Sequence, residues 1–260
     1  MLHILLTNDD GVHALGLLAL AQALASLGRV TILAPEKNWS ASGHVKTMHR
    51  PLRVRPAQLS NGTPALVTDG APSDCVALAV LGLVEGPIDL VVSGINPNAN
   101  LGHDVTYSGT VTAAMEAAIA GLAGMAVSLD SPENHAGALD FGPAARVARC
   151  LARLVLTKGL PPGICLNVNI PYYRRLEDLR GVAVTRQGLR VYHDALVRRQ
   201  DPRGRPYYWI GGESPTGILE EGTDFWALAE GYVSVTPLQL DLTAHGQLRS
   251  LAGWDWRLQD

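Results

Sequence analysis

The first 35 residues constrain the fold of this chain more than any other segment. An apolar run from His3 to Thr7 ends in a polar turn, a stretch rich in Leu and Ala runs from Leu15 to Leu27, and a second apolar run covers Val30 to Ala34. Leu and Ala favour helix, so the order is strand, turn, helix, strand, in the length of one βαβ unit. Such a unit places its two strands parallel, with a right-handed crossover.

The same alternation continues through the middle of the chain. Helices are expected from Pro72 to Val84, from Thr110 to Leu122 and around Ala144 to Leu154, and strands from Ile88 to Val92, Ala126 to Leu129 and Cys165 to Ile170. The strand runs are continuously apolar, which suits a sheet covered on both faces. The sequence therefore predicts an α/β fold with a doubly wound, mostly parallel sheet over residues 1–185.

Residues 186–260 differ from this core in composition, because they hold four of the five tryptophans: Trp209, Trp226, Trp254 and Trp256. Strands are expected from Arg190 to Val197 and from Arg205 to Ile210, which together predict a projecting hairpin. A further strand is expected from Tyr232 to Thr236. A hairpin of this size is not stable alone, so it needs a surface to pack on, either its own core or a second copy of the chain.

Composition excludes several classes of protein. Charged residues make up only 17% of the chain and the formal net charge is -3, which argues against a nucleic-acid polymer as partner. No apolar stretch reaches the roughly 20 residues that a bilayer requires, and no positive segment precedes the first apolar run, so neither a membrane span nor a secretory signal is expected. Cys75, Cys150 and Cys165 are widely spaced and are expected to be buried thiols of a reducing cytoplasm.

Two adjacent acids, Asp9 and Asp10, follow the first predicted strand. At about 4 Å and an effective dielectric of 20, two carboxylates repel by roughly 4 kcal/mol. A divalent cation turns this repulsion into attraction, and oxygen ligands favour magnesium or manganese over zinc. Gly11 gives the turn the freedom to direct both side chains to one ion. The alternative is an ordinary surface turn in which Asp10 caps the following helix.

Two further polar loops follow predicted strands, where open parallel sheets bind their ligands. The loop from Glu36 to His44 offers hydroxyls, an amide and an imidazole, and His44 is a candidate phosphate contact. The loop from Ser93 is longer than the usual, roughly 2–6 residues, and ends in Ser108-Gly109-Thr110 at the start of a helix. Hydroxyls and free N–H groups there predict an anion site, although Ser108 or Thr110 acting as a plain N-cap is the alternative.

Taken together, these motifs resemble the SurE family, the stationary-phase survival proteins that act as metal-dependent 5'-nucleotidases. The resemblance covers nearly the whole chain. It rests on Thr7-Asn8-Asp9-Asp10-Gly11, Ala34-Pro35 with Ser40, Gly70-Ala71-Pro72-Ser73-Asp74-Cys75, Ser93-Gly94-Ile95-Asn96, Tyr107-Ser108-Gly109-Thr110 and Gly231-Tyr232-Val233-Ser234-Val235-Thr236-Pro237-Leu238.

The resemblance implies a Rossmann-like core that hydrolyses nucleoside 5'-monophosphates to nucleoside and phosphate, with 3'-nucleotides and short polyphosphate as further substrates. It implies one divalent ion per subunit, Mg²⁺ or Mn²⁺, held by Asp9, Asp10, Ser40 and Asn96. Phosphate contacts are expected from Asn100, Ser108, Gly109 and Thr110. The family also forms dimers or tetramers with exchanged C-terminal segments, which implies that residues 186–260 serve oligomerisation.

The expected chemistry is metal-assisted hydrolysis of a phosphomonoester. Asp9 or Asp10 is expected to position the attacking water or accept its proton, while Ser108 and Thr110 stabilise charge on the phosphate. His44 and His103 are the candidate general acids. The chain departs from the family pattern at Pro97-Asn98, where a glycine commonly stands two residues after the metal asparagine, and at His103, which replaces an often acidic residue.

Two other functions fit the same residues. A phosphatase with an aspartate nucleophile also places an acidic turn after its first strand. A non-catalytic nucleotide-binding module is the second alternative, because folds of this type host many functions.

Overall fold

The computed structural model describes residues 1–132, 135–173 and 175–257. Its main sheet consists of β1 (His3–Thr7), β2 (Arg29–Pro35), β3 (Val54–Gln58), β4 (Pro64–Thr68), β5 (Leu90–Asn96), β6 (Ala123–Asp130), β7 (Ile164–Pro171), β8 (Gly181–Val184) and β11 (Tyr232–Gln239). These nine strands lie in the order β3-β4-β2-β1-β5-β6-β7-β11-β8. Neighbouring strands run parallel, except that β3 is antiparallel to β4 and β11 is antiparallel to β7.

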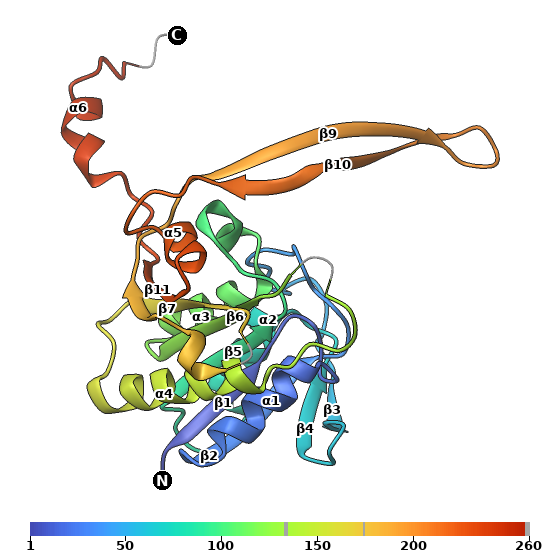
Figure 1. Ribbon diagram of the computed structural model, residues 1–260, viewed down its shortest axis with the longest axis vertical. Helices are drawn as coiled ribbons and strands as arrows, with labels where there is room; N and C mark the ends of the chain where they lie inside the picture. The colour runs from blue at the N-terminus through green and yellow to red at the C-terminus, as the bar shows by residue number, and fades with distance from the viewer. Residues whose placement is uncertain (133–134, 174, 258–260) are drawn as a thin grey trace.

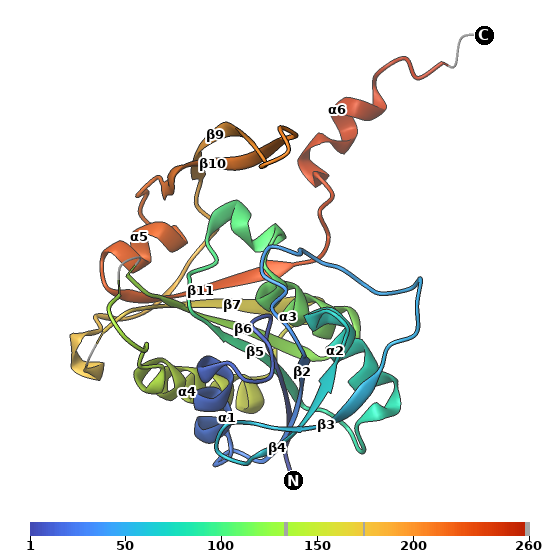
Figure 2. The same cartoon turned by 90° about the vertical axis from the view of Figure 1, so that its right-hand side faces the viewer.

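Helices cover both faces of this sheet (Figure 1). On one face lie α1 (Leu15–Leu24) and α4 (Gly142–Lys158), and on the other lie α2 (Pro72–Leu78), α3 (Gly109–Ile119) and α5 (Asp224–Ala229) (Figure 2). Alternate side chains of β1 serve the two layers, because Ile4 and Leu6 pack in one apolar cluster and Leu5 packs in the other. Each such buried side chain stabilises the fold by about 1.5–3 kcal/mol.

The predicted α/β class and the doubly wound, mostly parallel sheet are confirmed. The helix expected from Pro72 to Val84 divides, because α2 ends at Leu78 and continues as a π-helical turn over Ala79–Leu83. Gly82, with a φ of 109°, ends that turn. The strands β3, β4 and β8 and the helix α5 were not among the expected elements.

The predicted hairpin is present and longer than expected. It consists of β9 (Arg190–Gln200) and β10 (Pro206–Gly217), which pair with each other and stand away from the body of the molecule (Figure 1). A C-terminal arm that contains the short helix α6 (Leu248–Ala252) also projects (Figure 2). The strand β11 instead lies inside the main sheet, between β7 and β8. The division of the chain at residue 185 stays a prediction, and the sheet itself crosses it.

The expectation of three buried thiols is wrong for one of them. Cys75 and Cys165 are buried, and burial raises the pKa of their thiols to about 12 and about 11. Cys150 is exposed on α4, because Ala148 and Ala152 on the same helix take the buried positions. Within the part of the chain that the structure describes, no helix combines the length and the apolar character needed to cross a bilayer.

Candidate active site

The polar loops meet where the order of strands reverses along the sheet. From β1 the chain crosses by α1 to β2 on one side, while β5 lies on the other side of β1. Such a switch point opens a crevice at the carboxyl ends of the strands. Thr7 of β1 is in register with Ser93 of β5. The acidic turn after β1 and the Asn96 end of β5 therefore leave the sheet at the same edge.

Asp9 is buried, at 3% exposure, against the first turn of α3. Its Oδ1 accepts a hydrogen bond from the Thr110 hydroxyl at 2.6 Å, and its Oδ2 accepts one from the Thr110 N–H at 3.2 Å. Gly109 makes this approach possible, since a Cβ there would lie 2.8 Å from the Cβ of Asp9. The positive end of the helix dipole thus faces this carboxylate.

Asp10 lies beside Asp9 and is partly buried. Burial, and then the charge of Asp9, raise the pKa of the Asp10 carboxyl to about 6. Burial also raises the pKa of Asp9, against the opposing effect of its bonds from Thr110. Among the described residues, no Lys, Arg or His forms an ion pair with either acid. Two crowded carboxylates without a cation suit a divalent ion.

The loop from Glu36 to Thr47, called loop 36–47 below, runs over these two acids. The Trp39 N–H donates to the carbonyl oxygen of Asp9 at 2.7 Å. The Asn38 amide donates to Asp10 Oδ1 at 3.3 Å, and the Ser40 N–H donates to Asn38 Oδ1 at 2.7 Å. Ser40 is therefore linked to Asp10 through Asn38. Asn38 supplies the amide expected in this loop, but it was not among the predicted site residues, since an amide two residues before a serine is also a common turn signal.

Asn96, at the end of β5, contributes a further oxygen to the same edge. Its amide nitrogen donates to the carbonyl of Asn98, so its amide oxygen is the atom left for a cation. Pro97 follows where the strand ends, and its carbonyl accepts a bond from the Ser131 hydroxyl. Nearby, the buried Asn8 Oδ1 and Ser93 Oγ have no hydrogen-bond partner among the described residues. This edge thus offers carboxylate, amide and hydroxyl oxygens, the donors that Mg²⁺ and Mn²⁺ prefer.

The predicted anion site has a more specific arrangement than the sequence suggested. Ser108 is the N-cap of α3, with its Oγ accepting from the Val111 N–H at 3.1 Å. An accepting hydroxyl still has its own hydrogen to donate, so capping and anion binding are compatible at Ser108. Asn100 is buried, and its side-chain amide donates to the Ser128 hydroxyl. Its backbone N–H donates to Asn169 Oδ1, and its carbonyl accepts from the amides of Asn167 and Asn169.

Among the described residues, neither candidate general acid, His44 or His103, forms a hydrogen bond with Asp9 or Asp10. His44 Nε2 lies 3.0 Å from Glu116 Oε2, six residues along α3 from Thr110. His44 also lines a cavity of about 620 Å³ between α3 and the end of β11. His103 is exposed on the 3₁₀ turn at Gly102–Thr106.

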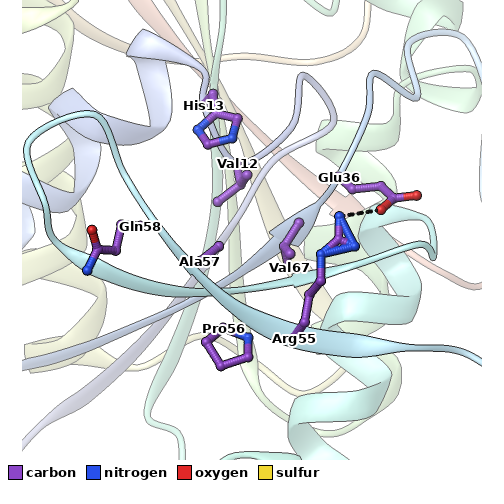
Figure 3. Close-up of a pocket in the computed structure, with 8 residues that line it drawn as sticks. All are labelled: Val12, His13, Glu36, Arg55, Pro56, Ala57, Gln58 and Val67. Carbon is purple, nitrogen blue, oxygen red and sulfur yellow. Dashed lines mark hydrogen bonds and ion pairs between the residues drawn. The ribbon is translucent and has the colours of Figure 1, made fainter.

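A separate cavity of about 280 Å³ opens beside the acidic turn (Figure 3). Val12 and His13 line one side and β3 lines the other, and Glu36 pairs there with Arg55 at 2.8 Å. Neither Asp9 nor Asp10 lines it, so it is distinct from the oxygen-rich edge.

Comparison with known proteins shows which family this chain is similar to. The family described as "Survival protein SurE" matches residues 4–194. The chain is 52% identical to the 5'-nucleotidase SurE of Chloroflexus aggregans over 98% of this chain and 100% of that protein, and 50% identical to 5'-nucleotidase SurE 1 of Thermus thermophilus over 97% of each. The crystal structure of the SurE protein from Aquifex aeolicus aligns with a TM-score of 0.80 and 43% identity, over 96% of this chain and 98% of that one. The chain therefore belongs to the SurE family.

Proposed function

We propose that this chain is a divalent-metal-dependent 5'-nucleotidase that hydrolyses nucleoside 5'-monophosphates to nucleoside and phosphate. The observation that carries the proposal is the Asp9–Asp10 pair at the switch point of the sheet, with no cationic partner among the described residues and with Asp9 held against the N-terminus of α3. The names of the Chloroflexus and Thermus relatives support the same activity.

The residues at this edge fit a divalent cation. Asp9, Asp10, Ser40 and Asn96 are proposed to hold one Mg²⁺ or Mn²⁺ per subunit. When bound, the ion supplies neutralisation of phosphate charge and a water of lowered pKa. The unpaired carboxylates, and not a histidine or cysteine cluster, define the donor set, which favours a hard ion over zinc.

Phosphate binding, the orientation of Asp9 and proton transfer are assigned to residues of the chain. The Ser108 hydroxyl and the Gly109 N–H bind phosphate oxygens at the positive end of α3. Thr110 orients Asp9, because its hydroxyl already donates to that carboxylate. Asp9 or Asp10 accepts the proton of the attacking water. Asn100 and His44 stay proposed phosphate contacts, and His44 and His103 stay the candidate acids for the leaving 5'-oxygen.

The proposal extends to the range of substrates, the assembly and the compartment of the protein. The 3'-nucleotides and short polyphosphate are further substrates, because the proposed contacts are made to phosphate and not to the base. The chain forms a homodimer or homotetramer in which residues 186–260 of one copy pack on another. Three unpaired cysteines suit the reducing cytoplasm as its compartment.

The deciding experiment is a phosphate-release screen over nucleoside monophosphates with Mg²⁺, Mn²⁺ and Ca²⁺. Hydrolysis should stop in EDTA and return with Mn²⁺ or Mg²⁺ more fully than with Ca²⁺, which prefers more ligands at longer distances. Activity that survives exhaustive chelation would exclude metal-assisted hydrolysis. A trapped aspartyl-phosphate at Asp9 would favour the aspartate-nucleophile alternative, and nucleotide binding without phosphate release would favour the non-catalytic one.

A further inference from the structure

Loop 36–47 is fixed at its near end to the proposed metal site. The Trp39 N–H donates to the Asp9 carbonyl, and the Gly43 N–H donates to the carbonyl of Tyr107 at 2.8 Å. Between these two anchors lie Ser40, Ala41 and Ser42, of which the first two are exposed. The position of Ser40 therefore depends on where the flanking parts of the loop are held.

The far end of the loop is held by two buried acids on different helices. The side chains of His44 and Lys46 point to one side of the loop and contact Glu116 of α3. Thr47 lies on the other side and donates to Asp74 of α2. Glu116 lies 3.0 Å from His44 Nε2 and 2.8 Å from Lys46 Nζ. The end of the loop is thus clamped between the two helices.

Glu116 is the more informative of these two anchors. Its side chain is only 6% exposed, and a buried carboxylate is costly unless it is paired, so its bonds to the loop are strongly favoured. Asp74 also accepts a bond from the Ala71 N–H at the start of α2, so a change there disturbs a helix end as well. Glu116 lies in mid-helix, and α3 is the helix whose first turn holds Asp9.

We propose that Glu116 is a positioning residue for the metal site. Through His44 and Lys46 it holds loop 36–47 in register with α3, so that Ser40 and Asn38 meet the carboxylates that the same helix orients. Glu116 acts through the loop and contacts neither the ion nor the substrate. The inference rests on the proposed metal site, since the benefit of fixing the loop is a preformed set of oxygen ligands.

The test is direct Mn²⁺ binding to the full chain by calorimetry, with no turnover involved. Glu116→Gln keeps the size of the side chain and removes its charge. We expect Mn²⁺ affinity to fall about tenfold, as when residues that orient metal ligands are changed. Hydrogen exchange at the Trp39 and Gly43 amides should accelerate in the metal-free variant.

Two further variants make the result specific. Lys46→Met removes one of the two bonds to Glu116 from a half-exposed position, so it carries the test if Glu116→Gln fails to fold. It should weaken Mn²⁺ binding about threefold, because the contact between His44 and Glu116 stays in place and still holds the loop. Its kcat at saturating Mn²⁺ should stay within about twofold, because the bound ion restores the position of the loop.

Arg55→Met breaks the exposed Glu36 pair at the other end of the loop and should leave Mn²⁺ affinity unchanged. Wild-type affinity and exchange in Glu116→Gln, or in Lys46→Met if that variant carries the test, would overturn the inference while leaving the metal site intact. A wild-type chain that binds no Mn²⁺ would overturn both.

Discussion

At the scale of single residues, Asp10 has opposite effects on activity and on stability. Its folded pKa of about 6 lies above the ordinary 3.8, so the charged form destabilises the metal-free fold above pH 6, and this penalty disappears as pH falls toward 4. Asp10→Asn should abolish hydrolysis and yet stabilise the metal-free protein at pH 8 by about 1 kcal/mol, or roughly 2–4 °C in Tm.

Calorimetry in EDTA measures this effect, and the difference in Tm should shrink as the pH is lowered from 6 to 4. Asp9→Asn is the control, since Asp9 accepts two bonds from Thr110 and should show no comparable gain. A metal-free Asp10→Asn variant that melts below the wild type at pH 8 would contradict the account.

Ser108 allows its two roles to be separated, because the N-cap and the hydroxyl donor respond differently to substitution. Ser108→Ala should cost about 1 kcal/mol of stability, whereas Ser108→Gly should cost only a few tenths, since Gly is a tolerated N-cap. Both variants should lower kcat roughly 100-fold with a smaller change in KM, because both lose the donor to the phosphate. Steady-state kinetics beside urea unfolding checks this. Full turnover in Ser108→Gly would reduce Ser108 to a cap.

At the scale of elements, the conformation of loop 36–47 carries a cost at Ala41. Among the described residues it is the one non-glycine with positive φ, at 57°. A side chain in this region is disfavoured by roughly 1–2 kcal/mol, so Ala41→Gly should stabilise the protein by about 1 kcal/mol. Urea unfolding measures the change. Ala57→Gly in β3 is the matched control, where the same substitution should destabilise by about 0.5–1 kcal/mol.

Elements buried on both faces are the ones that the sequence predicts best. The strands β1 and β2 and the helix α1 match expectation to within a few residues, because continuous apolar runs have no other stable place. The edge strands carry weaker signals. In β3, Pro56 interrupts a partly exposed segment, and β8 is four residues long with Val182 and Val184 exposed. Such short edges are stabilised by their neighbours and leave little local pattern.

The residues of the candidate site also differ in how well local sequence indicates them. Asp9, Asp10 and the Ser108–Thr110 turn could be selected from residue type and from position after a strand, whereas Ser40 and Asn96 came from the family resemblance. Glu116 gave no signal, because it lies within an Ala-rich helix and its partner His44 is 72 residues away in sequence. Contacts of this range depend on the packing of α2, α3 and the loop, which no local pattern records.

At the scale of the whole molecule, the β9–β10 hairpin presents apolar side chains that its own core does not cover. Leu196 and Ile210 are a cross-strand pair, 72% and 85% exposed. Replacing both by Thr keeps the preference for strand and should reduce the proposed oligomer to a smaller species, with a lower Tm. Light scattering at micromolar concentration measures the mass.

Leu81→Thr is the control for the hairpin variant, since Leu81 is 84% exposed on a different surface and its loss should leave the mass unchanged. A strictly monomeric wild-type protein, or a double variant that keeps the wild-type mass, would contradict a role for the hairpin in assembly.

The position of β11 in the sheet also affects how the protein folds while it is being synthesised on the ribosome. Among the described strands, β8 pairs with β11 alone, so it cannot enter the sheet until the 55 residues from Thr185 to Gln239 have been synthesised. At about 5–20 residues per second that delay lasts roughly 3 to 11 s. Throughout it, β7 is an open edge and β8 has no partner, which is the state that invites aggregation. A message truncated before Tyr232 would therefore lose two strands of the sheet, and its product would be a substrate for chaperones and proteases.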